Sequence, residues 1–238
     1  MNLLQKSTLQ NFSDWKAQAE IKGGIILVNK DEGWTSFDIV RKIKHLLAIK
    51  KVGHSGTLDP LASGLMLIAI GKATKLLNDL QNADKQYIGR IKIGATTPSY
   101  DRETQETDKV NITFLDENKI YSLLDTFKGD ILQFPPVFSA LKFEGKRAYK
   151  LARKKENIQL EPRKVQISNF EILEIDCPFI KFKIDVSKGF YVRSFAYDFG
   201  KELGYPSYLY SLQRTRIGEF FLENAINVED IQNIQNLI

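Results

Sequence analysis

The sequence has one cysteine, Cys177, and only two histidines, His45 and His54. One cysteine excludes an internal disulfide framework and any metal site built from cysteine pairs. Two histidines with no His-Glu-x-x-His pattern do not provide the ligands of a zinc centre, so we predict no metal site. No stretch approaches the roughly 20 consecutive apolar residues that a transmembrane helix needs. We therefore predict no interaction with a membrane.

Several patterns that identify common protein classes are also missing. Residues 1–22 are too polar for a secretory signal peptide, which predicts a cytoplasmic protein. Lys72 is followed by Ala73 instead of the Ser or Thr of a phosphate-binding P-loop, and no Gly-x-Gly-x-x-Gly pattern follows a strand-like segment. His54, Ser55 and Asp59 are close in sequence but lack a nucleophile elbow. Nucleotide binding and serine hydrolysis are therefore disfavoured.

The composition is ordinary for a globular protein of 238 residues, with 43% hydrophobic and 26% charged residues. The net charge is +5, and positive residues gather in two stretches, 41–51 and 142–155, followed by Arg163 and Lys164. The second stretch is interleaved with aromatic residues, a composition that suits phosphate contacts and base stacking (Phe138, Phe143 and Tyr149). A solvated helix face has the same charge pattern, so charge alone does not decide between the two.

Apolar patterning predicts the main elements. Strands are expected at residues 24–30, 65–70, 86–95 and 179–187. Helices are expected from Ser36 to about Ala48, at 194–203, and from Val228 onward. Thr35 and Asp38 form a capping box at the start of the first helix. The apolar face of that helix is expected to contain Phe37, Val40, Ile43 and Leu47.

Strands and helices are mixed without a regular strand–helix–strand rhythm. This predicts an α+β fold with a mixed, largely antiparallel sheet flanked by helices. We expect residues 1–22 to be an N-terminal extension with a short helix, and residues 23–238 to form one domain. Residues 116–162 are more charged and contain Pro135-Pro136, which predicts an insertion that projects from the sheet.

The segment from Gly53 to Gly64 is the most informative part of the chain. It places one carboxylate, Asp59, among three glycines, a proline and a histidine, directly before an apolar strand. Glycine permits unusual backbone conformations, and Pro60 biases Asp59 toward an extended shape. Such a loop holds a carboxylate in one place, as catalysis requires. An Asp-Pro pair that only begins a turn is an equal alternative from the loop alone.

A second segment, residues 187–194, combines an aromatic residue and an arginine. A Lys-Gly turn there is followed by Tyr191 and Arg193, which would share one face in extended structure. Tyr191 could then cover a planar base while Arg193 pairs with a carboxylate such as Asp59. A core tyrosine and a surface arginine would give the same pattern.

These segments resemble motifs of the TruB-type tRNA pseudouridine synthases. GTLDPLASG, residues 56–64, resembles the family signature G-x-L-D-P-x-A-x-G. Further resemblances follow in family order and together cover about residues 23–222: GIILVNKDEGWTSFDIV, DKQY, PPVFSALKFEGKRAYKLAR, PRKVQI, SKGFYVRS and LQRTRIGEF. The resemblance implies the pseudouridine synthase fold with a thumb-like insertion at about 116–162.

The resemblance also implies an activity and roles for single residues. The family isomerises uridine 55 in the TΨC loop of tRNA to pseudouridine, without cofactor or metal. Asp59 would be the catalytic nucleophile or base, Arg193 its partner, and Tyr191 a residue near C5 of the base. The expected substrate-binding residues are Tyr87, which would stack on the flipped base, His54, which would fill the space that the base leaves, Lys30 and Leu212. The implied partner is the T-stem-loop of tRNA, and we expect a monomer with no obligate protein partner.

The sequence departs from the family in a few places. Longer members carry a C-terminal PUA domain, for which there is no room before Ile238. Phe138 replaces the usual thumb tyrosine, and Lys150 stands where an acidic residue is frequent. Three first steps stay open for Asp59: attack on C1′, attack on C6, or abstraction of a sugar proton. Two other functions also stay open, namely an RNA-binding or tRNA-folding protein without catalysis and a synthase for another RNA uridine.

Overall fold

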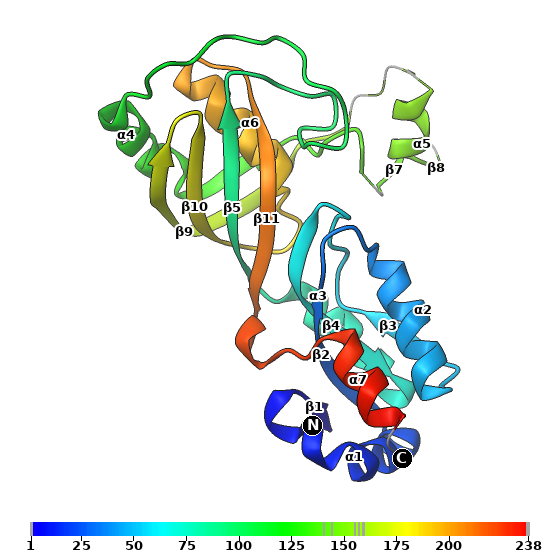
Figure 1. The fold of residues 1–238 in the computed structure, drawn as a ribbon. Helices are drawn as coiled ribbons and strands as arrows, with labels where there is room; N and C mark the ends of the chain where they lie inside the picture. The colour runs from blue at the N-terminus through cyan, green and yellow to red at the C-terminus, as the bar shows by residue number, and fades with distance from the viewer. Residues whose placement is uncertain are drawn as a thin grey trace. The chain divides into compact units, whose positions relative to one another are not determined.

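The computed structural model describes residues 2–139, 141–143, 145–154, 156, 158 and 160–236. The chain divides into two compact units. Residues 1–87 and 213–238 form the first, here named the Asp59 unit, and residues 88–212 form the second, here named the Arg193 unit. Strands β5 (Lys85–Ile93) and β11 (Ser207–Ile217) have residues in both units. Figure 1 shows the elements of each unit.

The Asp59 unit contains both chain ends. Its N-terminal elements are β1 (Leu3–Leu4), η1 (Lys6–Asn11), α1 (Phe12–Lys22), β2 (Gly24–Lys30), α2 (Ser36–Leu47), β3 (Val52–His54), β4 (Ala62–Ile70), η2 (Gly71–Leu76) and α3 (Leu77–Asn82). Its C-terminal elements are β12 (Phe220–Phe221), η3 (Leu222–Asn224) and α7 (Val228–Gln235). β1 pairs with β2 in parallel, whereas β2 and β3 each pair with β4 antiparallel. The predicted strands at 24–30 and 65–70 are confirmed.

Strands β2 and β4 are buried on both faces, which explains their continuous apolar sequences. One face carries Ile26, Val28, Met66, Ile68 and Ile70, which pack with residues of α1, α2 and α7. The other face carries Ile25, Leu27, Leu65, Leu67 and Ala69, which pack with Ile217 and Phe220. Residues of the expected N-terminal extension take part in the first cluster (Leu4, Phe12, Trp15 and Ala19).

Helix α2 begins as its capping box predicts. The Thr35 side chain accepts a hydrogen bond from Asp38 N, and the Asp38 carboxylate accepts one from Thr35 N. The predicted apolar face was wrong at Phe37, which is 69% exposed, while Ile39 is buried. At 100° per residue, Phe37 lies about 160° around the helix from Ile39 and therefore faces away from the core.

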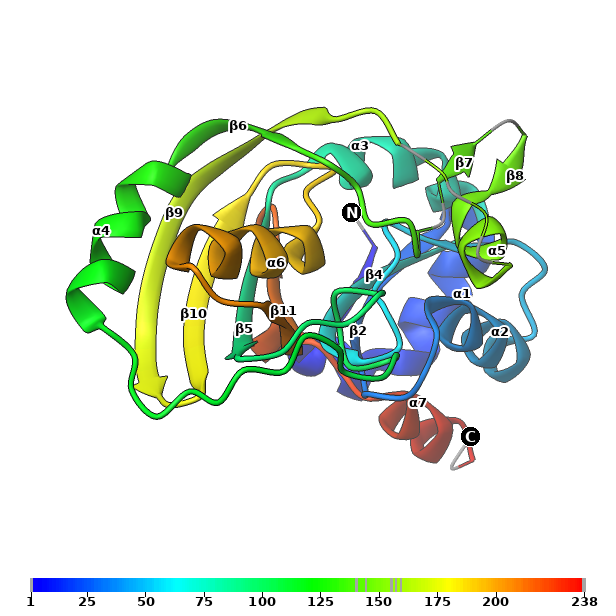
Figure 2. The same ribbon diagram turned by 90° about the horizontal axis from the view of Figure 1, so that it is seen from above.

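The Arg193 unit is built on a strongly curved sheet. It contains α4 (Glu117–Phe127), β6 (Gly129–Gln133), β7 (Lys142–Phe143), β8 (Lys146–Arg147), α5 (Ala148–Arg153), β9 (Arg163–Asp176), β10 (Phe179–Val186) and α6 (Val192–Leu203), besides most of β5 and β11. The strand order is β11-β5-β10-β9-β6. Helix α6 lies along one face of this sheet (Figure 2). Phe195 of α6 packs there against Phe170 of β9 and Phe182 of β10.

The predicted insertion at 116–162 contains two different parts. Strand β6 belongs to the main sheet, because it pairs antiparallel with β9, and helix α4 packs against β9 and α6. Strands β7 and β8 form a separate two-stranded sheet, and Ala148, Leu151, Ile158 and Leu160 form a small separate core. Residues 140, 144, 155, 157 and 159 of the predicted insertion lie outside the described residues.

Over the residues that the structure describes, the main sheet has ten strands and is mixed and largely antiparallel, with helices against it, as the sequence predicts. In the described part of the chain, no helix combines the length and apolar character needed to cross a bilayer.

Candidate active site

The Asp59 loop connects β3 to β4 and is fixed on both sides of the carboxylate. Ser36 Oγ accepts a hydrogen bond from Leu58 N at 2.8 Å and donates one to Leu58 O at 3.1 Å. Pro60 O accepts from Gly33 N at 2.8 Å, and Asp59 O accepts from the N–H of Ala62 at 3.0 Å. Since Ser36 and Leu58 are buried, these bonds are protected from water. The backbone around Asp59 is therefore held in one conformation.

Arg214 supports the same loop from β11. Its guanidinium is buried and donates to three backbone carbonyl oxygens: Leu65 O at 2.7 Å, Gly56 O at 3.4 Å and Thr57 O at 3.5 Å. A buried charge without a carboxylate needs such dipoles around it. The sequence prediction did not single out Arg214, because its contacts are about 150 positions away along the chain.

Gly64 allows β4 to approach Arg214 closely. Its φ is +109°, and a Cβ built there would overlap Arg214 O and lie 2.8 Å from Arg214 N. Every residue but glycine is therefore excluded on two grounds, backbone conformation and space. This explains the last glycine of the 56–64 segment in physical terms.

Lys30 ends β2 beside the loop and is fully buried. Its Nζ donates to Trp34 O at 2.7 Å and to Asp31 O at 2.9 Å. Burial lowers the pKa of Lys30 to about 8; the Asp59 charge opposes this shift, whereas the Arg214 charge adds to it. Two buried cationic side chains, Lys30 and Arg214, thus belong to the electrostatic environment of the Asp59 loop.

His54 is the last residue of β3 and is half-buried. Its Nδ1 accepts a hydrogen bond from Gly56 N at 3.2 Å. The pKa of His54 is lowered, mainly by burial and further by the Arg214 charge, although the bond from Gly56 raises it. A neutral imidazole protonated on Nε2 fits these contacts, so His54 provides shape rather than charge at neutral pH.

Two apolar positions of the predicted site lie where β5 and β11 pass from one unit to the other. Tyr87 is the last residue of β5 in the Asp59 unit and is 9% exposed. Leu212 lies on β11 at the end of the Arg193 unit and is 8% exposed. Tyr87 alternates with half-buried neighbours along β5, as period-two patterning predicts.

Arg193 lies in the first turn of α6, which corrects the prediction of an extended segment shared with Tyr191. Gly189, at φ +81°, turns the chain, and Tyr191 is the last extended residue before the helix. Arg193 Nη1 lies 3.4 Å from Asp101 Oδ2 and donates to Ser99 O at 3.3 Å. Both side chains of this ion pair are buried, so removing either one would leave the other as an unpaired buried charge.

Asp101 is a second carboxylate that the sequence prediction missed. Its Oδ1 accepts hydrogen bonds from Ser99 Oγ at 2.5 Å and from Glu103 N at 2.9 Å. It lies within the long connection between β5 and α4, and its partner Arg193 is far away in sequence. Only the fold identifies it.

Tyr191 is held at the start of α6 by the side chain of Gln133. Tyr191 N donates to Gln133 Oε1 at 2.7 Å, and Gln133 Nε2 donates to Tyr191 O at 3.0 Å. Gln133 is itself buried at the end of β6. These two hydrogen bonds to the backbone fix the position from which the Tyr191 ring projects.

The predicted site residues thus fall in two sets. The Asp59 unit holds Asp59, Lys30, His54 and Tyr87, and the Arg193 unit holds Tyr191, Arg193 and Leu212. Each unit also holds a buried arginine that is fixed by oxygen atoms: Arg214 by backbone carbonyls in the Asp59 unit, and Arg193 by Asp101 and Ser99 O in the Arg193 unit. Among the described residues, no group of three or more His, Cys, Asp and Glu side chains could hold a metal ion.

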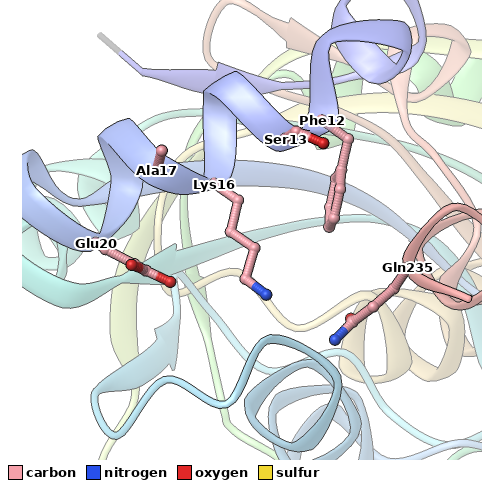
Figure 3. A pocket seen from close by; sticks show the side chains of 6 residues that line it. All are labelled: Phe12, Ser13, Lys16, Ala17, Glu20 and Gln235. Carbon is pink, nitrogen blue, oxygen red and sulfur yellow. The ribbon is translucent and has the colours of Figure 1, made fainter. Parts of the chain in front are cut away.

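A separate hollow of about 380 Å³ lies between α1 and α7 (Figure 3). It is lined by Phe12, Ser13, Lys16, Ala17, Glu20 and Gln235. None of these residues belongs to the Asp59 loop or contacts it through a described hydrogen bond, so this hollow is not part of the candidate site.

The chain is similar to a known protein family and to named bacterial proteins. Residues 44–192 match the model of the "TruB family pseudouridylate synthase (N terminal domain)". The chain is 46% identical over 227 residues to a tRNA pseudouridine synthase B of Parabacteroides distasonis, covering 92% of this chain and 96% of that protein. It is 43% identical over 217 residues to the protein of the same name from Clostridium tetani, covering 90% of this chain and 75% of that one.

Solved structures with a similar fold include a Cbf5–Nop10–Gar1 complex, with a TM-score of 0.70 and 28% identity. The archaeal box H/ACA sRNP Nop10–Cbf5 complex gives a TM-score of 0.69 and 26% identity. The matches cover 91% and 93% of this chain but 56% of each of those chains. The chain therefore spans little more than half the length of these structural relatives.

Proposed function

This chain belongs to the TruB family of pseudouridylate synthases, and we propose that it converts uridine 55 in the TΨC loop of tRNA to pseudouridine. The reaction is an isomerisation: the N1–C1′ bond breaks, the detached uracil rotates in place, and C5 joins C1′. C5 then loses its proton and N1 gains one, so the product has the same composition as uridine. Relatives at 43–46% identity bear the name tRNA pseudouridine synthase B, which supports tRNA as the substrate. The single structural observation behind the proposal is the rigidly held Asp59 loop.

Asp59 is the group that we assign to the chemical step. Attack by its carboxylate on C1′ or C6, or abstraction of a sugar proton, would each begin the isomerisation with one ionised carboxylate. Holding the loop through Ser36, Gly33 and Arg214 reduces the reorganisation needed when the nucleotide arrives. The nearby ammonium of Lys30 interacts electrostatically with the Asp59 carboxylate.

Arg193 is proposed as the direct partner of the Asp59 carboxylate. Its guanidinium already pairs with Asp101, and a guanidinium has enough donors to serve two carboxylates at once. In this arrangement Asp101 positions Arg193, and Arg193 positions Asp59.

The aromatic residues are assigned to the uracil. Reaching a base inside a folded loop requires flipping it out, which costs a few kcal/mol that stacking on Tyr87 would partly offset. Tyr191, fixed by Gln133, is assigned to the side of the base that carries C5. His54 would occupy the space that the flipped nucleotide leaves, Leu212 would line the apolar side, and Lys30 would lie near the entry.

We also propose how the protein contacts the RNA, its oligomeric state and its location. The thumb-like segment, whose described basic residues include Lys146, Arg147 and Lys154, would contact phosphates of the T-stem-loop. We propose that the protein acts as a monomer without a cofactor or obligate protein partner, and in the cytoplasm, where tRNA is used. Light scattering during size-exclusion chromatography measures the oligomeric state.

The test of substrate and position uses two transcripts, a full-length tRNA and a minimal T-stem-loop. Carbodiimide treatment followed by primer extension locates pseudouridine. The proposal predicts one modified position, uridine 55, in both RNAs. Modification at another uridine would support a different synthase, and tight binding with no modification would support a non-catalytic RNA-binding protein.

A further inference from the structure

A second basic surface lies in the Asp59 unit, at the end of the β2–β4 pair that is opposite to Asp59. A hollow of about 430 Å³ is lined there by three lysines, Lys22, Lys72 and Lys75, and by uncharged residues (Asn2, Gly23, Gly24, Ile25, Ala73 and Leu76). We name it the distal lysine groove. The pairing of β2 with β4 runs from Gly24↔Ile70 at the groove to Lys30↔Gly64 at the Asp59 loop. Six residue steps along a strand correspond to about 20 Å.

The fold brings these lysines together from separate segments. Lys22 ends α1, whereas Lys72 and Lys75 lie on η2. Gly23, at φ +83°, lets the end of α1 approach η2 so closely that a Cβ there would lie 2.9 Å from Lys72 N. The Asn2 side chain donates to Gly23 O at 3.4 Å and so ties the N-terminus to the same wall. Residues 2–22 therefore help to build the groove.

Among the described residues, the lysines of the groove have no acidic partners. Within the described part of the chain, none of the three lysines forms an ion pair, and all three side chains are exposed. A fourth exposed lysine, Lys51, lies close to the groove. Its backbone carbonyl oxygen accepts a hydrogen bond at 2.8 Å from the N–H of Gly71, the residue before Lys72. Like charges around one hollow repel one another unless an anion lies between them.

We propose that the distal lysine groove binds phosphates of the tRNA backbone outside the T-stem-loop. Several exposed ammonium groups suit a polyanion, whose phosphates release counterions when lysines neutralise them. The inference rests on the proposed function for the identity of the RNA. It assigns a role to two features that catalysis leaves unexplained, the N-terminal segment and the Gly71–Lys75 stretch.

The experiment measures binding of full-length tRNA and of the T-stem-loop by fluorescence anisotropy over a series of salt concentrations. The protein carries Asp59→Asn, so that no turnover occurs during the titration. The test variant adds Lys72→Gln and Lys75→Gln. The charge-matched control adds Lys6→Gln and Lys16→Gln, which change lysines of the same unit that do not line the groove.

The expected result for the test variant is a loss of about threefold to tenfold in affinity for full-length tRNA near physiological salt. The slope of log affinity against log salt should fall by about 1.5 in magnitude, which corresponds to two lost phosphate contacts. Affinity for the T-stem-loop should stay within about twofold, and the control should behave like the parent protein. Lys72→Glu with Lys75→Glu should give a larger loss.

Three results would overturn the inference: equal losses with both RNAs, no loss with either RNA, or the same loss in the control. A titration with inorganic phosphate, followed by NMR chemical shifts, tests binding of free phosphate alone. If the test variant loses the phosphate-induced shift changes but keeps the tRNA affinity of the parent protein, the groove binds only free phosphate and the inference is overturned. Failure of the proposed function is separate, because it would appear as unmodified uridine 55 with the otherwise wild-type chain.

Discussion

Replacing Gly64 with alanine tests whether the close approach of β4 to Arg214 holds the Asp59 loop. Two costs add at this position. A non-glycine residue at φ +109° costs about 1–3 kcal/mol. The new Cβ also overlaps backbone atoms of Arg214, which cannot rotate away as a side chain could, and overpacking adds about 1–3 kcal/mol. We expect the free energy of unfolding to fall by about 2–6 kcal/mol.

The matched control is Gly33→Ala. Gly33 also has a positive φ, +88°, but a Cβ there would meet no atom within 4 Å. Only the conformational cost of about 1–3 kcal/mol applies, so we expect a smaller loss than for Gly64→Ala. Urea unfolding measures both values, and for a chain of this size each kcal/mol lowers Tm by about 2–4 °C. Equal losses in the two variants would refute the reasoning, because the overlap at Gly64 would then cost nothing.

Three further predictions concern Ser36, Lys30 and Asp198. Ser36→Ala leaves the N–H and C=O of Leu58 without their partner, so we expect a loss of about 1–3 kcal/mol in unfolding free energy and slower turnover at unchanged tRNA affinity; weaker affinity with unchanged turnover would contradict this. Because the folded pKa of Lys30 is about 8 and its ordinary value 10.5, the unfolded chain binds more protons between these values. The free energy of unfolding of the wild type, relative to that of Lys30→Met, should therefore rise from about pH 8 to about pH 10. If the two proteins show the same dependence of stability on pH, the lowered pKa of Lys30 is contradicted. The pKa of Asp198 is raised from 3.8 to about 6, mainly by burial, so the folded chain binds more protons between these values and its stability falls as pH rises through them. Asp198→Asn should then raise Tm at neutral pH and have little effect near pH 4, and a change that is the same at both pH values would exclude this cause.

The parts of the fold that the sequence predicts are those whose signals are local. The start of α2 is encoded by Thr35 and Asp38, three residues apart, and β2 and β4 are recognisable because both of their faces are buried. Period-two alternation likewise identifies β5 and β10.

The sequence predictions are wrong or incomplete where contacts between distant segments determine the structure. Arg214 contacts carbonyl groups about 150 positions away, and Asp101 pairs with Arg193 across the long stretch that contains the insertion. Neither contact leaves a periodic pattern in the sequence. Tyr191 and Arg193 would share one face in extended structure, yet the chain turns at Gly189 and enters α6 between them.

The role of Asp59 is decided by comparing Asp59→Asn with Asp31→Asn, an exposed neighbour of Lys30, in single-turnover reactions on the T-stem-loop. Both substitutions remove one negative charge and keep the size of the side chain. We expect Asp59→Asn to abolish pseudouridine formation while tRNA affinity and Tm stay close to wild type, and Asp31→Asn to react at the wild-type rate. Undiminished turnover by Asp59→Asn would contradict the assignment of Asp59 as the catalytic group.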